Sequence, residues 1–102
     1  MKHIGKIISI SAMNERSYTT SQGEQRETAE IGVVVSDGSD CGNFEFSDDN
    51  ARNFAKDVAT GIYKPGDTVM VDFYITDSVS KNADGSEKGH FTHLRARRIM
   101  KL

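Results

Sequence analysis

The sequence predicts an all-β domain that contains one helix, and three observations lead to this prediction. Several segments alternate apolar and polar residues with the period of two that a half-buried strand requires. Only the segment between Ser47 and Gly61 spaces its apolar residues at the period of a helix. Turn-forming pairs, such as Pro65-Gly66, separate the segments. A chain of 102 residues supports one hydrophobic core and not two, so we expect a single domain over residues 1–102.

The first half of the chain is predicted to form three strands, at residues 2–11, 28–37 and 42–47. The first is rich in isoleucine, and Gly5 within it favours a bulge or a sharp bend. The other two each have one apolar face, formed by Ile31, Val33 and Val35 in the second and by Phe44 and Phe46 in the third. A long polar loop, residues 11–28, is expected between the first two strands, and such a loop is either functional or mobile.

A helix of about three turns is expected after the third strand. Ser47 or Asp48 is placed to cap its N-terminus, where Asp48 and Asp49 also suit the positive end of the helix dipole. Gly61 supplies the stop. The apolar stripe of this helix is narrow, which suits a helix that plugs one end of a barrel.

The last third of the chain is predicted to form a long β-hairpin. Its first strand, residues 67–75, turns Val69, Val71, Phe73 and Ile75 to one face and Thr68, Met70, Asp72 and Tyr74 to the other. A polar tip follows at residues 77–89 and contains the turn-forming pair Asp84-Gly85. The second strand, residues 90–102, is the most basic segment of the chain.

The order of elements is strand, strand, strand, helix, strand, strand. This is the order of the OB-fold, a five-stranded Greek-key barrel that binds mostly oligonucleotides or proteins. Closing the barrel removes the exposed edges that an open five-stranded sheet would have to protect. An open sheet covered by one helix is the structural alternative.

Residues Pro65 to Ile99, with the runs VMVDFYI and FTHLRARRI around a polar tip, resemble the second half of bacterial single-stranded-DNA-binding proteins and their small uncharacterised relatives. The resemblance covers most of the chain as an order of elements and the last third as a residue pattern. It implies a barrel that binds single-stranded nucleic acid. Members of that family carry aromatic binding faces and an acidic C-terminal tail, whereas this chain ends Met100-Lys101-Leu102 and has no Trp, so weak binding is expected.

Net charge and cysteine content limit the other classes of protein to which this chain could belong. The formal net charge is −2, which gives the whole protein no long-range attraction for nucleic acid or anionic membranes. From Lys88 onward, however, every charged side chain is basic. Cys41 is the only cysteine, so no intrachain disulfide can form and a reducing cytoplasm is predicted. No apolar run is long enough to cross a bilayer, and no membrane partner is expected.

The strongest candidate site lies on the last strand, where alternation places Phe91, His93, Arg95 and Arg97 on one face. Aromatic rings there could stack on bases and guanidiniums could contact phosphates. Tyr74 on the neighbouring strand and Lys6 would extend the face. The simpler expectation is structural: Arg95 and Arg97 pair across the sheet with nearby acids, namely Asp72, Glu45 or Glu30.

The two long loops could form the lips of a binding groove. Arg16, Tyr18 and Arg26 would supply one lip, and Lys81 and Lys88 the other. Glutamate and aspartate side chains in both loops dilute this positive charge, so solvated polypeptide is the expectation for any single residue. Among these residues we include Arg26 in the candidate site.

Neither a metal centre nor a catalytic site is predicted. His90 and His93 would point to opposite faces of a strand, and no cysteine pair completes a tetrahedral set. No phosphate-binding glycine loop or nucleophile motif occurs. We therefore predict a binding module that is not an enzyme and has no cofactor. The first hypothesis is a weak, sequence-tolerant binder of single-stranded DNA or RNA. The second is a protein-interaction module or a small homo-oligomer, such as a homodimer that meets through Val34 or Tyr74.

Overall fold

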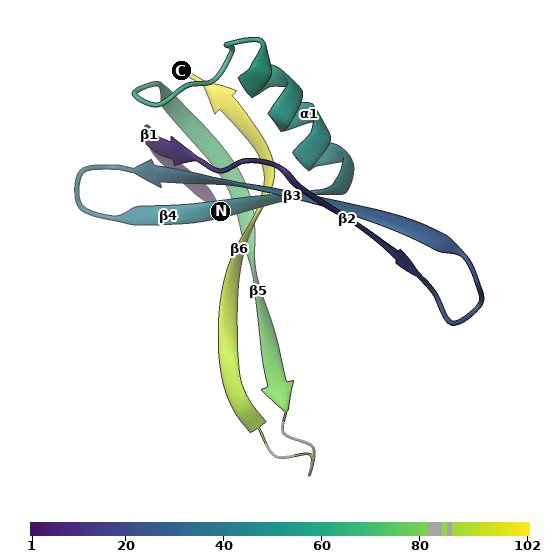
Figure 1. Ribbon diagram of the computed structural model, residues 1–102. Helices are drawn as coiled ribbons and strands as arrows, with labels where there is room; N and C mark the ends of the chain where they lie inside the picture. Colours follow the sequence, from purple (N-terminus) through teal and green to yellow (C-terminus); the bar gives the residue numbers. More distant parts are fainter. Residues whose placement is uncertain (82–84, 86) are drawn as a thin grey trace.

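A computed structural model describes residues 1–81, 85 and 87–102, and the side chains of residues 1–77, 85 and 92–102. The described elements are six strands and one helix, shown in Figure 1. Their bounds are β1 (Lys2–Ile10), β2 (Asn14–Thr19), β3 (Gln25–Ser36), β4 (Cys41–Ser47), α1 (Asp48–Ala59), β5 (Thr68–Lys81) and β6 (Glu87–Lys101).

The strands close into the predicted five-stranded Greek-key barrel. The sheet runs β1-β5-β6-β4-β3-β2, and an additional pairing of β1 with β3 closes it. The β4–β6 pair is parallel, with Phe44 opposite Leu94, and the other pairs are antiparallel. β1 and β2 together act as one interrupted strand along β3. Ser11 bridges the interruption, because its N–H donates to the Gly32 carbonyl (2.9 Å) and its Oγ accepts from the Gly32 N–H (2.8 Å).

The first strand bends sharply, as its sequence indicated. β1 pairs with β5 up to Lys6 and with β3 from Lys6 onward, so it turns from one side of the barrel to the other. Gly5 lies at this corner with its α-carbon against the Ser36 carbonyl, where a β-carbon would clash. The register irregularity itself lies between Ile7 and Ser9. The glycine therefore allows close approach, and the bulge follows it.

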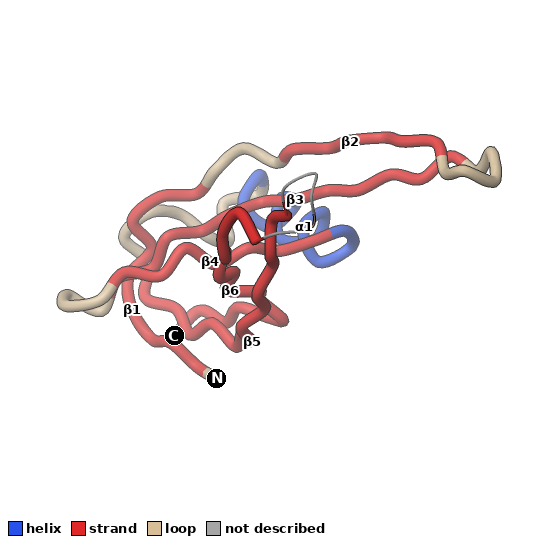
Figure 2. Tube along the Cα trace, turned by 90° about the horizontal axis from the view of Figure 1, so that it is seen from below, coloured by secondary structure: helices blue, strands red, loops and turns tan. Residues whose placement is uncertain are grey.

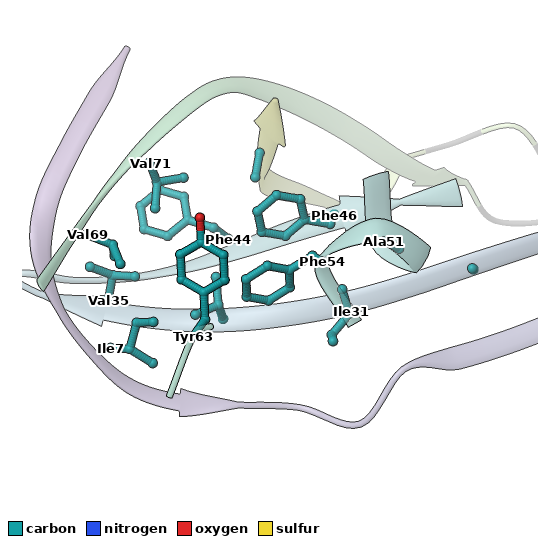
Figure 3. Close-up of a cluster of buried hydrophobic side chains, with 13 residues drawn as sticks. Ile7, Ile31, Val35, Phe44, Phe46, Ala51, Phe54, Tyr63, Val69 and Val71 are labelled. Carbon is teal, nitrogen blue, oxygen red and sulfur yellow. The ribbon is translucent and has the colours of Figure 1, made fainter. Parts of the chain in front are cut away.

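The core fills the barrel and continues under the helix. Figure 3 shows its side chains, with Phe44 and the valines inside the barrel and Phe46 facing Phe54 of α1. The Phe46 and Phe54 rings stack with centroids 4.5 Å apart. Ala51 is fully buried. Because only the narrow stripe of α1 is apolar, the helix covers one end of the core, as predicted.

The two ends of α1 differ in how well the sequence predicted them. The C-terminus follows prediction: Gly61 adopts φ of 82°, and the N–H groups of Gly61 and Ile62 donate to the carbonyls of Val58 and Asp57. Ser47 occupies the N-cap position without a side-chain capping bond. The Asp48 carboxylate instead accepts a hydrogen bond from the Ala29 N–H (3.3 Å), which ties the start of the helix to β3.

Two hairpins extend beyond the barrel, one formed by β2 with β3 and the other by β5 with β6 (Figures 1 and 2). We call the first the β2–β3 arm and the second the β5–β6 hairpin. The prediction of a long loop at residues 11–28 is wrong, because most of these residues form the paired β2–β3 arm. The radius of gyration, 15.8 Å, exceeds the roughly 13 Å of a compact chain of this length, as two protruding hairpins require.

The faces of β5 depart from strict alternation once the strand leaves the barrel. Val69 and Val71 are fully buried as predicted, whereas Ile75 is 48% exposed because it lies beyond the core. Met70 lies on the open face as predicted, between its pairing partners Ile4 and Met100, but it is only 8% exposed. No helix in the described part of the chain is long and apolar enough to cross a membrane.

Candidate nucleic-acid interface

One row of residues crosses the outside of the barrel on four neighbouring strands. Gly32 of β3 pairs with Glu45 of β4, Glu45 pairs with Arg95 of β6, and Arg95 pairs with Tyr74 of β5. Directly paired residues project from the same side of a sheet. We call this side, which continues along β3 into the β2–β3 arm, the outer face. The row joins the β2–β3 arm to the β5–β6 hairpin.

Tyr74 is the aromatic member of the row, and Arg97 of β6 contacts it. The Arg97 guanidinium lies over the Tyr74 ring, 4.7 Å from its centroid, and Tyr74 remains 40% exposed. A bulge makes this contact possible: Phe73 pairs with Ala96 and Asp72 pairs with Arg98, so Arg97 is the extra residue. A guanidinium over a ring face is attracted to its π electrons. Arg97 therefore holds the ring in place.

Glu45 binds two of the predicted site residues. Its Oε2 accepts from Arg95 Nη1 at 2.9 Å, and its Oε1 lies 3.5 Å from His93 Nδ1. The structural expectation is thus confirmed for Arg95. It is wrong for Arg97, because the bulge shifts the phase of the strand and brings Arg98 to Asp72 at 3.6 Å. One face of β6 therefore carries both paired and stacked cations.

Two other predicted site residues, Arg26 and Lys6, lie away from the row that contains Glu45 and Tyr74. Arg26 lies on the arm opposite Tyr18 and contacts Glu24 at 3.2 Å. Lys6 pairs with Thr68, which precedes Tyr74 by about 20 Å at the rise of a strand. The structure thus keeps Lys6 apart from the outer-face row.

Phe91, Lys81 and Lys88 are described only in their backbones. The Phe91 backbone pairs with Ser78, farther out on the β5–β6 hairpin than Tyr74. Its side chain lies outside the described residues, and so do those of the two lysines.

A shallow cavity at the centre of the outer face was not predicted from the sequence. It has a volume of about 210 Å³, and its lining includes Ser11, Asn14 and Asn43 beside Gly32 and Glu45. Gly32 was the available signal, because a glycine inside a strand often marks a close approach. A β-carbon there would lie 3.1 Å from the Asn43 side-chain oxygen, so the glycine keeps the floor of the cavity open.

Comparison with solved structures supports the fold assignment. Crystal structures of the mitochondrial single-stranded DNA binding protein Rim1 from S. cerevisiae match the whole of this chain and 92% of their own chains. Two crystal forms give TM-scores of 0.54 and 0.55 at sequence identities of 19% and 14%. This chain has an OB-fold like theirs. No family model matches the chain, and no curated protein matches it.

The position of the outer face can be compared with the surface that oligonucleotide-binding OB-folds use. OB-folds that bind oligonucleotides do so on their second and third barrel strands, between the loop joining the first two strands and the loop joining the last two. In this chain those strands are β3 and β4, and the two loops are drawn out into the β2–β3 arm and the β5–β6 hairpin. Among the described residues, no group of three or more potential metal ligands is assembled.

Proposed function

We propose that the outer face binds single-stranded nucleic acid without strong sequence preference. The observation that carries this proposal is the Tyr74–Arg97 pair, an exposed ring held by a cation at one end of a continuous strand face. Every base has a π-face, so stacking on a tyrosine tolerates any sequence. The guanidinium beside the ring is placed to contact the phosphate next to a stacked base.

The electrostatics of the face favour weak binding. Glu45 already neutralises part of the charge of Arg95, and Glu30 adds a second carboxylate close to the central cavity. Within the described part of the chain, Arg26, at the other end of the face, is paired with an exposed glutamate. We therefore assign stacking to Tyr74 and phosphate contacts to Arg97 and Arg26. Arg95 contributes after it is released from Glu45, and Lys6 is left out of the site.

His93 and Phe91 complete the proposed path along the β5–β6 hairpin. His93 lies beside Glu45, with its Nδ1 3.5 Å from the carboxylate. The Phe91 backbone follows it toward the tip of the hairpin, and a stacking role for its ring stays a prediction from the sequence. Arg95 contacts Glu45 on this path. The affinity therefore depends on how easily the nucleic acid displaces the Glu45 carboxylate from Arg95.

The test is fluorescence anisotropy with a labelled oligo-dT of about 30 nucleotides, long enough to cover more than one OB-fold site. We expect binding that weakens steeply with salt, since affinity would come largely from counterion release. Tyr74→Ala and Arg97→Ala should each weaken it by about tenfold. Arg52→Ala is the matched control, because it removes a surface cation of α1 that is away from the outer face. No binding at micromolar protein in low salt would refute the proposal.

RNA and DNA are both proposed ligands, and oligo-U beside oligo-dT distinguishes them. The proposed surface offers rings and guanidiniums, which do not depend on the 2′-hydroxyl. We therefore expect similar affinities for the two. We also propose that the protein has no enzymatic activity and that the single cysteine, Cys41, exposed on the surface, reflects a reducing cytoplasm.

Self-association is the second candidate function, and a separate surface favours it. Ile4, Met70 and Met100 form a row across β1, β5 and β6, in which Ile4 is 56% and Met100 45% exposed. The adjacent row carries both charge signs on Lys2, Asp72 and Arg98. Such a surface can meet a second copy of itself about a two-fold axis. We place the homodimer contact here, since Val34 and Tyr74 lie on the outer face, where a second copy would compete with a bound strand.

The test of self-association is mass as a function of concentration, measured by sedimentation velocity. The native chain should shift from monomer to dimer, and Ile4→Asp should remain monomeric. Ile62→Asp is the control, because Ile62 is 47% exposed and follows the end of α1. A native chain that stays monomeric at high concentration would remove this candidate.

A further inference from the structure

A second cavity opens between α1 and β6, beside the bulge at Arg97. Its volume is about 190 Å³, and its floor consists of Phe46, Phe54 and Tyr63. Figure 3 shows these three rings close together beneath the helix. All three are at most 9% exposed, so the floor is fixed by core packing. Drug-sized ligands occupy roughly 300–1,000 Å³, and this cavity is therefore suited to a single ring system.

The helix supplies the polar wall of the cavity. Asn50, Asn53 and Asp57 are spaced three and four residues apart, which puts them on one helix face, and all three line the cavity. Among the described residues, none of these three side chains makes a hydrogen bond or ion pair within the protein. Each amide offers both a donor and an acceptor, whereas a carboxylate only accepts. The wall thus has free hydrogen-bonding groups for a ligand.

The carboxylate of Asp57 acts on the floor as well. Burial, and then the charge of Asp57, raise the pKa of Tyr63, so its hydroxyl stays protonated. That hydroxyl donates to the Ile99 carbonyl (3.1 Å) and is held in place. Asp57 places an acceptor on the helix side of the cavity, and Arg97 and Arg98 line its other side. The helix side therefore favours a neutral ring that offers hydrogen-bond donors.

Arg97 connects this cavity with the outer face. Its guanidinium lies over Tyr74, and the same residue lines the cavity together with Arg98. Arg98 already contacts Asp72, so Arg97 is the residue assigned to a phosphate at the rim. That phosphate would have one neighbouring base near Tyr74 and the other at the mouth of the cavity. The two places are thus joined by a single side chain, Arg97.

We propose that the cavity binds one unstacked base of the bound strand and favours guanine. This inference rests on the proposed function and adds to it a base-selective position. Guanine presents two adjacent donors, its N1–H and its 2-amino group, which one carboxylate can accept together. Adenine, cytosine and thymine each offer only one donor group on that edge. A base taken out of the stack is recognised by hydrogen bonds of this kind.

The experiment compares oligo-dT strands of about 15 nucleotides, near the upper site size of one OB-fold, that carry one central dG, dA or deoxyinosine. The dG strand should bind about tenfold more tightly than the dA strand, the discrimination of one good bidentate contact. Deoxyinosine keeps N1–H and lacks the 2-amino group, so its affinity should lie between the two. Equal affinities for all three, with oligo-dT still bound, would overturn the inference and leave the proposed function standing.

Two variants locate the preference. Asp57→Asn should abolish the preference for dG and change the affinity for plain oligo-dT much less, because thymine offers the carboxylate only one donor group. Asp49→Asn is the matched control, an exposed acid of the same helix that does not line the cavity, and it should keep the preference. Retention of the dG preference in Asp57→Asn would contradict the assignment. Thermal melting checks that both variants are folded. Asn53→Ala, which removes another polar side chain of the cavity wall, tests the same preference independently. Loss of oligo-dT binding by the native chain would refute the proposed function itself.

Discussion

The two hairpins that leave the barrel are built from the same kind of strand pair and differ in what supports them. Every side chain of β2 is exposed, and among the described strands it pairs with β3 alone. The β5–β6 hairpin begins inside the core, where Val69, Val71 and Ala96 are buried. Tyr74, which is exposed, is in contact with Arg97 of the paired strand. If the proposed ligand binds, we expect the β2–β3 arm to adapt to it and the base of the β5–β6 hairpin to offer contacts that are already formed.

The cations of the two hairpins show the same difference. Arg26 and its partner Glu24 have side chains that are 61% and 62% exposed, and such pairs contribute at most about 1 kcal/mol. Arg95 and Glu45 are 27% and 31% exposed and lie closer together. Arg26 can thus exchange its partner for a phosphate at little cost. Arg95 must first leave a better-protected carboxylate.

The largest expected effect concerns what anchors each hairpin. Phe44 is 1% exposed, and its ring meets Phe73 of β5 edge to face with centroids 4.9 Å apart. We expect Phe44→Ala to lower the free energy of unfolding by about 3–5 kcal/mol, because it leaves a cavity under the base of the β5–β6 hairpin. Tyr18→Ala on the arm should change it by no more than about 0.5 kcal/mol. Urea denaturation measures both, and similar losses would show that the arm packs against the core.

The next effect compares the two exposed tyrosines as stacking partners. Tyr74→Ala should weaken oligo-dT binding by about 1–3 kcal/mol, the contribution of one stacked base. Tyr18→Ala should cost less, since ordering an unsupported side chain on binding costs about 0.5–1.5 kcal/mol. Anisotropy titrations of the two variants at one salt concentration give the comparison. A larger loss for Tyr18→Ala would reverse the roles assigned to the two hairpins.

A smaller effect, an increase in affinity, is expected when the glutamates that contact Arg95 and Arg26 are neutralised. Glu45→Gln should strengthen binding several-fold by releasing Arg95 and His93. It should also steepen the dependence of log K on log salt by about 0.7 for each additional phosphate that the protein neutralises on a single strand. Glu24→Gln, the corresponding change on the arm, should do little, because Arg26 is already available. An equal increase in affinity in the two variants would mean that Glu45 does not restrain Arg95.

The smallest effect concerns the short β3–β4 hairpin, whose turn is closed by a carboxylate. The N–H groups of Asp40 and Ser39 donate to Asp37 Oδ1 at 2.7 and 2.8 Å and lower the pKa of Asp37. A lowered pKa in the folded state means that this stabilisation is present above the ordinary aspartate pKa, about 3.9, and is lost as the pH falls through the folded value. Asp37→Ala should therefore be less stable than the native chain at neutral pH.

The two chains should converge in stability as the pH falls below 4, roughly the ordinary aspartate pKa. Thermal melting over a range of pH follows this convergence. A difference in stability that persisted in acid would show that Asp37 acts through packing and not through its charge.

Periodic burial explains what was predictable from the sequence. Ile31, Val33 and Val35 alternate because one face of β3 fills the barrel, and Gly61 ends α1 because only glycine adopts its backbone angle easily. These signals are local, and together with the order of elements they predicted the OB-fold. The basic strand and the exposure of the Tyr74 ring were also predicted from the sequence.

The tertiary structure decided what depends on pairing between distant segments. The β2–β3 arm is held by backbone hydrogen bonds between exposed residues, so no apolar period marks it. The bulge at Arg97 is visible only when β6 is aligned with β5, and it determines that Arg97 stacks on Tyr74 while Arg98 meets Asp72. The sequence by itself determined which faces are buried, because burial requires apolar side chains at fixed intervals. Register across strands determined which charges meet, because each such contact joins residues that are far apart in the chain.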